Sequence, residues 1–168
     1  MVRELFRSAK SSVWIASFAI DRSEKARQLF QPLLERMEQI PDLQMRMVIN
    51  VLHPYQSDEP TSSLLRRFAQ TFRTQIWTSG RLPEVFYDPR SLAVGVKMKS
   101  CFHAKCVVVD EEQALITSAN FTEAAHERNI EVGVLLNDTE TAKAMQVQFE
   151  ILVSRKILHR LLGLSDSL

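Results

Sequence analysis

The first half of the chain alternates between continuous apolar runs and segments whose apolar residues recur at helical spacing. The run Ser12–Ile20 is rich in β-branched and aromatic residues, which indicates a buried strand. The run Leu43–Leu52 has the same character and indicates a second strand. The segment between them predicts a helix through its apolar positions, which are Ala26, Leu29, Phe30, Leu33, Leu34 and Met37.

The ends and the middle of that helix contain residues with strong backbone preferences. Asp21 and Glu24 predict the start, because acidic side chains at this position accept hydrogen bonds from free backbone N–H groups. Pro32 falls inside the apolar pattern, so we expect a kink or a break there. Pro41 then ends the segment before the second strand begins.

The same patterns predict the elements of the remaining chain. We expect helices over 61–74, 122–128 and from 137 to about 162, strands over 101–110, 114–118 and 131–136, and short strands near 75–77 and 85–87. Strands alternate with helices, but the middle of the chain contains hairpins. This combination predicts an α/β fold with a mixed β-sheet sandwiched by helices.

The composition is that of one water-soluble globular domain. The chain has 168 residues, of which 45% are hydrophobic and 24% are charged. It contains no linker or internal repeat, so we expect a single domain over residues 1–168. The apolar run Val13–Ile20 is too short to cross a membrane, and the first residues do not form a secretory signal. Two cysteines, Cys101 and Cys106, do not make a disulfide framework, which favours a reducing, cytoplasmic location.

The charge is unevenly distributed, although the net charge is only +1. Residues 1–100 contain 15 Lys and Arg against 10 Asp and Glu, whereas residues 101–168 contain 6 against 10. The basic first part is suited to an anionic substrate. The alternative is an ordinary solvated surface, and charge alone does not decide between the two.

The chemistry is concentrated in a short polar constellation around the predicted hairpin of residues 101–118. Alternate residues of a strand share a face, so His103 and Lys105 point the same way. Two cationic groups side by side repel one another, and an anion between them removes the conflict. Ser118 and Asn120, again two residues apart, can donate hydrogen bonds to the oxygens of a phosphodiester. The alternative for Ser118 and Asn120 is a helix cap before residue 122.

These residues resemble the HKD motif of the phospholipase D superfamily, H-x-K-x4-D-x6-G-S-x-N. His103, Lys105, Asp110, Ser118 and Asn120 match every spacing, and only Thr117 departs, where the family usually has glycine. The following stretch, NFTEAAHERNIEVGVLL, resembles the usual continuation of the family and includes Glu131. The resemblance implies a phospholipase D-like domain with one HKD motif.

The resemblance also implies a mechanism. One histidine attacks phosphorus to form a phosphohistidine, and a second histidine protonates the leaving oxygen and then activates water. The chain contains one motif, because no other histidine has lysine two residues later. We therefore expect a homodimer that completes the active site, with His103 of one copy as nucleophile and that of the other as acid.

The resemblance assigns a role to each of the other motif residues. Lys105 neutralises phosphate charge, Ser118 and Asn120 position the phosphoryl oxygens, and Glu131 accepts the far ring N–H of His103. Asp110 precedes a turn, and we expect it to hold the hairpin rather than to contact substrate. The family chemistry needs no cofactor and no metal. A zinc site at Cys101, His103 and Cys106 is disfavoured, because Cys106 lies on the opposite strand face.

Nucleic acid is the expected substrate, with DNA favoured over RNA. The short single-motif members of the superfamily are nucleases, and the chain has no membrane-binding segment. Lys97, Lys99, Arg66 and Arg67 are candidates for phosphate contacts, although the arginines also suit the solvated side of a helix. The alternatives are a phospholipase D or phosphatidyltransferase, and a nucleic-acid-binding scaffold without turnover. The chain also resembles the phospholipase D-like component of DISARM antiphage systems, which implies defence-system partner proteins.

Overall fold

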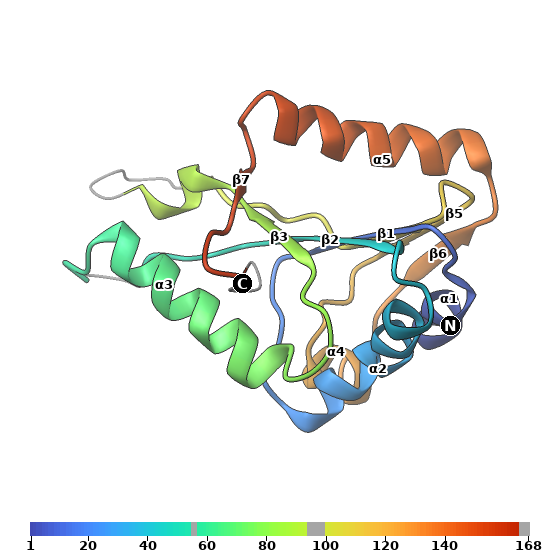
Figure 1. The fold of residues 1–168 in the computed structure, drawn as a ribbon, viewed down its shortest axis with the longest axis horizontal. Coiled ribbons are helices and arrows are strands. Elements are labelled where there is room, and N and C mark those ends of the chain that lie inside the picture. Colours follow the sequence, from blue (N-terminus) through green and yellow to red (C-terminus); the bar gives the residue numbers. More distant parts are fainter. Residues whose placement is uncertain (55–56, 94–99, 165–168) are drawn as a thin grey trace.

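A seven-stranded mixed sheet forms the centre of the structure, a computed structural model that describes residues 1–54, 57–93 and 100–164 (Figure 1). The strand order is β6-β5-β4-β1-β2-β3-β7. Strands β1, β2 and β3 are parallel to one another, and each pairing that involves β4, β5, β6 or β7 is antiparallel. The strands are β1 (Ser12–Ser17), β2 (Gln44–Ile49), β3 (Glu84–Tyr87), β4 (Cys106–Val109), β5 (Gln113–Thr117), β6 (Gly133–Leu136) and β7 (His159–Arg160).

Helices cover both faces of this sheet. Figure 1 shows α5 (Thr139–Ser154) on one face and, on the other, α1 (Val2–Ser8), α2 (Glu24–Gln39), α3 (Thr61–Thr71) and α4 (Glu123–Glu127). Each face has its own core. Val13, Ile15 and Val107 pack with the larger helical layer, whereas their neighbours Trp14 and Val108 pack on the α5 side. The alternation along each strand thus divides the apolar residues between two layers, and the predicted α/β fold class is confirmed.

Helix α2 differs from the prediction at two points. Its cap is Ser23, whose side chain accepts a hydrogen bond from the Ala26 backbone N–H. The helix continues through Pro32 without a break. Pro32 is itself buried beside Phe30 and Leu33, so the packing of this face offsets the one backbone hydrogen bond that proline removes.

Three further predictions were wrong at element boundaries, and one helix was missed. Residues 72–76 form a π-helix that extends α3, where a short strand was expected near 75–77. Strand β4 begins at Cys106, so residues 101–105 lie outside the regular strand, although the Lys105 carbonyl accepts a hydrogen bond from the Thr117 backbone N–H at 3.0 Å. Helix α5 ends at Ser154 because Lys156 adopts a positive φ of 56°, and the chain then turns back to pair with β3. Helix α1 was not predicted.

Candidate active site

His103 and Lys105 lie together at the end of the sheet where β1 finishes and β4 begins. The Nζ atom of Lys105 is 3.4 Å from Nδ1 and 3.5 Å from Nε2 of His103, and it donates a hydrogen bond to the His103 carbonyl oxygen at 3.0 Å. The two side chains therefore share a direction, although their segment is not a regular strand. His103 is exposed, which leaves its ring open to a ligand.

Phe18 forms one wall of this pair. It follows the last residue of β1, and its ring centroid is 5.0 Å from that of His103 at a tilt of 57°. Lys105 Nζ lies 5.6 Å from the same ring, within the range of a cation–π contact. The sequence offered no sign of this role, because Phe18 reads as one more apolar residue of a buried strand. Only the antiparallel pairing of β1 with β4 brings it to the motif.

Ser118 and Glu131 form a second pair at the end of β5. The Ser118 hydroxyl donates to a Glu131 carboxylate oxygen and accepts from the Val132 backbone N–H at 3.0 Å. Asn129 donates to the other oxygen of Glu131 at 3.2 Å. These hydrogen bonds, first that of Ser118 and then that of Asn129, hold the Glu131 pKa below its ordinary value, with a smaller contribution from Lys105. Glu131 is thus a carboxylate whose oxygens both point at polar donors.

The expected hydrogen bond from the His103 ring to Glu131 is not among the contacts of the described residues. The two carboxylate oxygens of Glu131 instead accept hydrogen bonds from Ser118 and Asn129. The ring of His103 is instead bordered by Lys105 and Phe18. The assigned role of Glu131 toward the imidazole stays a prediction. The Thr117 backbone N–H donates to the Lys105 carbonyl across the hairpin, and Glu131 is bound by the next residue, Ser118.

Asn120 joins the motif to the loop after β1. Its side-chain oxygen accepts a hydrogen bond from the Ala19 backbone N–H at 3.3 Å. The neighbouring backbone is fixed by Ser17, whose hydroxyl accepts from the Phe121 N–H at 3.4 Å. Asn120 does not cap α4, since Thr122 accepts the capping bond from Ala125. Asn120 thus connects the end of the motif to the turn that follows β1.

Asp110 lies at the other end of β4 and is fully engaged within the protein. Its carboxylate accepts hydrogen bonds from the backbone N–H groups of Lys10, Ser11 and Ser12 at 2.8, 2.7 and 2.9 Å and from the Ser11 hydroxyl at 2.9 Å. Burial alone would raise the Asp110 pKa, but these donors outweigh it and hold the pKa below its ordinary value. Asp110 also begins the hairpin turn, with φ of 55°. It connects the motif to the start of β1.

The candidate phosphate-binding residues lie apart from the motif or outside the described part of the chain. Arg66 and Arg67 are exposed on α3, and Arg67 pairs with Glu59 at 2.7 Å. Arg67 and Arg22 line a cleft of about 260 Å³ with Leu52. Residues 97 and 99, both lysines, lie outside the described residues. A basic cleft therefore exists beside the carboxyl ends of β1 and β2.

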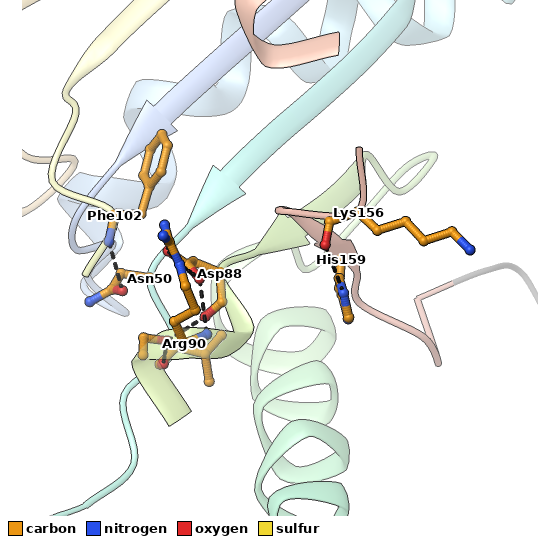
Figure 2. A network of polar contacts seen from close by, with 8 residues as sticks. Asn50, Asp88, Arg90, Phe102, Lys156 and His159 are labelled. Carbon is orange, nitrogen blue, oxygen red and sulfur yellow. Dashed lines mark hydrogen bonds and ion pairs between the residues drawn. The ribbon is translucent and has the colours of Figure 1, made fainter. Parts of the chain in front are cut away.

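A buried polar network holds the backbone that leads to His103. Figure 2 shows Asn50, just after β2, whose side-chain oxygen accepts from the Phe102 backbone N–H at 3.3 Å. The nearby Asp88 is 2% exposed and binds the Arg90 guanidinium at 2.7 Å. Asn50 thus anchors the residue next to His103 to the central strands, in a segment that precedes the regular ladder of β4.

The two thiols do not share a site with His103. Cys101 is exposed, whereas Cys106 is buried on the α5 side of the sheet. Burial raises the pKa of Cys106 to about 12, which keeps its thiol protonated. Among the described residues, no group of three or more His, Cys, Asp or Glu side chains is arranged to hold a metal ion.

Comparison with known families shows which family the chain belongs to. The family profile described as cardiolipin synthase, PLD-like domain, matches residues 2–153. The chain belongs to the phospholipase D-like family. The match includes both halves of the motif and the strands that carry them. Among curated proteins, none matches the chain at a significant level.

Three solved structures share the fold at low sequence identity. NucT from Helicobacter pylori is 15% identical with a TM-score of 0.62, and the match covers 91% of this chain and 85% of that one. Nuc from Salmonella typhimurium, a phospholipase D family member, is 16% identical with a TM-score of 0.57 over 95% and 87%. Phosphatidylserine synthase from Haemophilus influenzae is 15% identical with a TM-score of 0.64, over 88% of this chain and 33% of that one.

The helices in the described ranges include none that is both long and apolar enough to span a bilayer. The family places the chain among phospholipase D-like proteins, whose members are phosphodiesterases and related transferases.

Proposed function

We propose that the protein is a metal-independent phosphodiesterase that hydrolyses nucleic acid through a phosphohistidine on His103. One observation carries the proposal. His103 and Lys105 converge, and within the described residues no carboxylate is hydrogen-bonded to either side chain. A nucleophilic imidazole beside an unpaired ammonium suits an anionic ester, because the ammonium neutralises charge that would repel the attacking nitrogen.

The reaction needs a second imidazole, and we assign it to His103 of a second copy. One ring nitrogen attacks phosphorus, the bond to the leaving oxygen breaks, and the second imidazolium gives that oxygen its proton. Water then attacks the phosphohistidine while the second imidazole, now neutral, accepts a water proton, and the P–N bond breaks. The two rings must stand on opposite sides of phosphorus, which one ring cannot do.

The substrate assignment is supported by two features of the surface. Arg22 and Arg67 line a basic cleft that is separate from the motif, and the exposed position of His103 suits a polymer that lies across the surface. The match to NucT and Nuc covers most of all three chains, which favours the single-motif plan over the longer synthase. The resemblance to the DISARM component is not tested by the fold and stays a prediction.

The test measures hydrolysis of labelled single-stranded DNA, duplex DNA and RNA in the presence of EDTA. We expect cleavage of nucleic acid and, after a denaturing alkaline quench that preserves the acid-labile P–N bond, a labelled protein band, both absent in His103→Asn. A metal requirement that zinc or magnesium restores, or full activity in His103→Asn, would contradict the proposal.

A mixing experiment tests the two-copy site. Wild type is mixed with a growing excess of His103→Asn at constant total concentration. A site that needs both histidines gives activity proportional to the square of the wild-type fraction, because only homodimers of wild type are active. Independent sites give a linear decline, which would exclude the shared site.

Phosphatidyl transfer is the second candidate, and the fold likeness to phosphatidylserine synthase favours it. The discriminating assay offers phosphatidylcholine in mixed micelles beside the nucleic acids. Headgroup release that depends on His103, with the nucleic acids left intact, would replace the nuclease assignment and keep the mechanism.

A further inference from the structure

The edge of the sheet beside the motif carries a strip of exposed apolar side chains. The strip consists of Ile116, Ile130, Val132 and Val134, which are 46%, 100%, 72% and 53% exposed. Ile116 and Val134 are cross-strand partners, so they share one face of the β5–β6 pair. Strand β6 is the last strand at this edge. An apolar row along an unpaired edge is characteristic of a surface that another chain covers.

The strip is continuous with the candidate active site. Ser118 and Val132 exchange two hydrogen bonds, Ser118 N to Val132 O at 2.9 Å and Val132 N to Ser118 Oγ at 3.0 Å. A largely apolar groove of about 560 Å³ extends from Ile116 to Lys105 beneath Met145 of α5. The apolar surface therefore reaches the residues that the reaction requires.

The strip also lies within the reach of an interface centred on His103. Neighbouring strands are about 4.8 Å apart, so the start of β6 is about 10 Å from the chain at Lys105, two strands away. A standard interface buries about 800 Å² on each partner, which corresponds to a disc of about 16 Å radius. In-line attack places the two imidazoles about 7 Å apart, so the two-fold axis passes close to His103.

We infer that this strip is the surface through which a second copy of the chain docks to complete the active site. The inference rests on the proposed function, which requires the second copy beside His103. A two-fold axis sets a patch against its own copy. Apolar side chains can meet their own copies, whereas like charges would repel, and the four residues of the strip carry no charge. That property favours a second copy over an unrelated charged partner.

The test introduces charge into the strip away from the motif. In Ile130→Glu/Val134→Glu, two-fold symmetry brings like charges together, and we expect the dimer dissociation constant in analytical ultracentrifugation to rise at least about 100-fold. Hydrolysis falls at low protein concentration and recovers at high concentration. Folding is checked by circular dichroism and is expected to survive, because Ile130 is fully exposed. Leu162→Glu is the matched control, since Leu162 is 80% exposed but follows β7 at the opposite edge.

A charge-reversed partner makes the test specific. Ile130→Lys/Val134→Lys is also expected to be monomeric, and an equimolar mixture with the Glu variant is expected to form an active heterodimer. A Glu variant that dimerises like wild type would overturn the assignment of the strip as the dimer surface. It would leave intact the His103-dependent hydrolysis and the dependence of activity on the square of the wild-type fraction. Dimers that depend on the strip but hydrolyse no phosphodiester would support the surface and overturn the function. A wild type that stays monomeric during turnover would overturn both.

Discussion

The two ends of strand β4 carry residues of one motif, yet the protein holds them in opposite ways. At the amino end, His103 is exposed and its ring is bordered by Phe18 and Lys105. At the carboxyl end, the Asp110 carboxylate accepts hydrogen bonds from three backbone N–H groups and one hydroxyl of residues 10–12. The exposed His103 ring at the first end is accessible to a ligand, whereas the Asp110 carboxylate at the second end is already hydrogen-bonded within the protein.

The distance between the two ends of β4 also separates the two groups of residues. Lys105 and Asp110 are five residues apart along an extended chain, or roughly 16 Å at 3.3 Å per residue. A single phosphate group cannot contact both. Under the proposed function, the motif combines a chemical part with an architectural part, and the two differ in how many internal hydrogen bonds each side chain makes. Substitutions at the two ends should consequently affect different quantities.

The largest effect is expected at the chemical end. His103→Asn removes the proposed nucleophile, so kcat for the proposed phosphodiester hydrolysis should fall at least about 1000-fold. The melting temperature should stay within about 1 °C of wild type, because an exposed side chain contributes little to packing. Calorimetry together with a single-turnover assay measures both. A large drop in the melting temperature of His103→Asn would show that His103 also supports the fold, against the proposed difference between the two ends of β4.

The architectural end should show the reverse. Asp110→Asn keeps a residue that tolerates the positive φ but loses the carboxylate that faces four donors. The free energy of unfolding should fall by about 2 kcal/mol, measured by urea denaturation. Turnover at a temperature where the variant is folded should remain within about threefold of wild type. A folded but inactive variant would place Asp110 in the chemistry.

Low pH should reduce the contribution of the Asp110 carboxylate to the free energy of unfolding. The pKa of Asp110 is lower in the folded protein than in the unfolded chain, so folding favours the ionised carboxylate. That contribution is complete above the unfolded pKa, about 4, and is lost as pH falls through the folded pKa. The difference in unfolding free energy between wild type and Asp110→Asn should therefore narrow below about pH 4. A difference that stays constant down to pH 2.5 would assign the stability to something other than the charge.

The smallest effect is expected at Phe18, which contacts the His103 ring and which we propose positions it. Phe18→Leu keeps an apolar side chain but loses the aromatic contacts, worth about 1 kcal/mol, so kcat should fall about fivefold with KM unchanged. Phe18→Tyr should retain the wild-type rate. Leu65→Val on α3 is the control, because Leu65 is also partly buried but packs against the core of the larger helical layer. An equal loss in the control would point to general loosening.

Most of the fold followed from local patterns. The periods of the apolar residues predicted the strands β1, β2, β4 and β5 and the helices α2 and α5, because each buries one face or both against a layer. The errors fell where local preference was weak. The π-helix after Thr71 and the end of α5 at Ser154 depend on how those segments pack, and the local pattern alone favours a strand in one case and a longer helix in the other.

The sequence alone determined which residues share a face and which residue types meet in the motif. The spacing of His103 from Lys105 and of Ser118 from Asn120 is local information, but both pairs lie outside the strands, since β4 begins at Cys106 and β5 ends at Thr117, so strand alternation does not set their directions. Only the tertiary structure decided that Phe18 borders His103, that Glu131 bonds Ser118, and that Asp110 holds residues 10–12. Most of those contacts join segments about 85 to 100 residues apart. They exist because β4 inserts beside β1 in the sheet, an order that the packing of two apolar layers selects and no local period records.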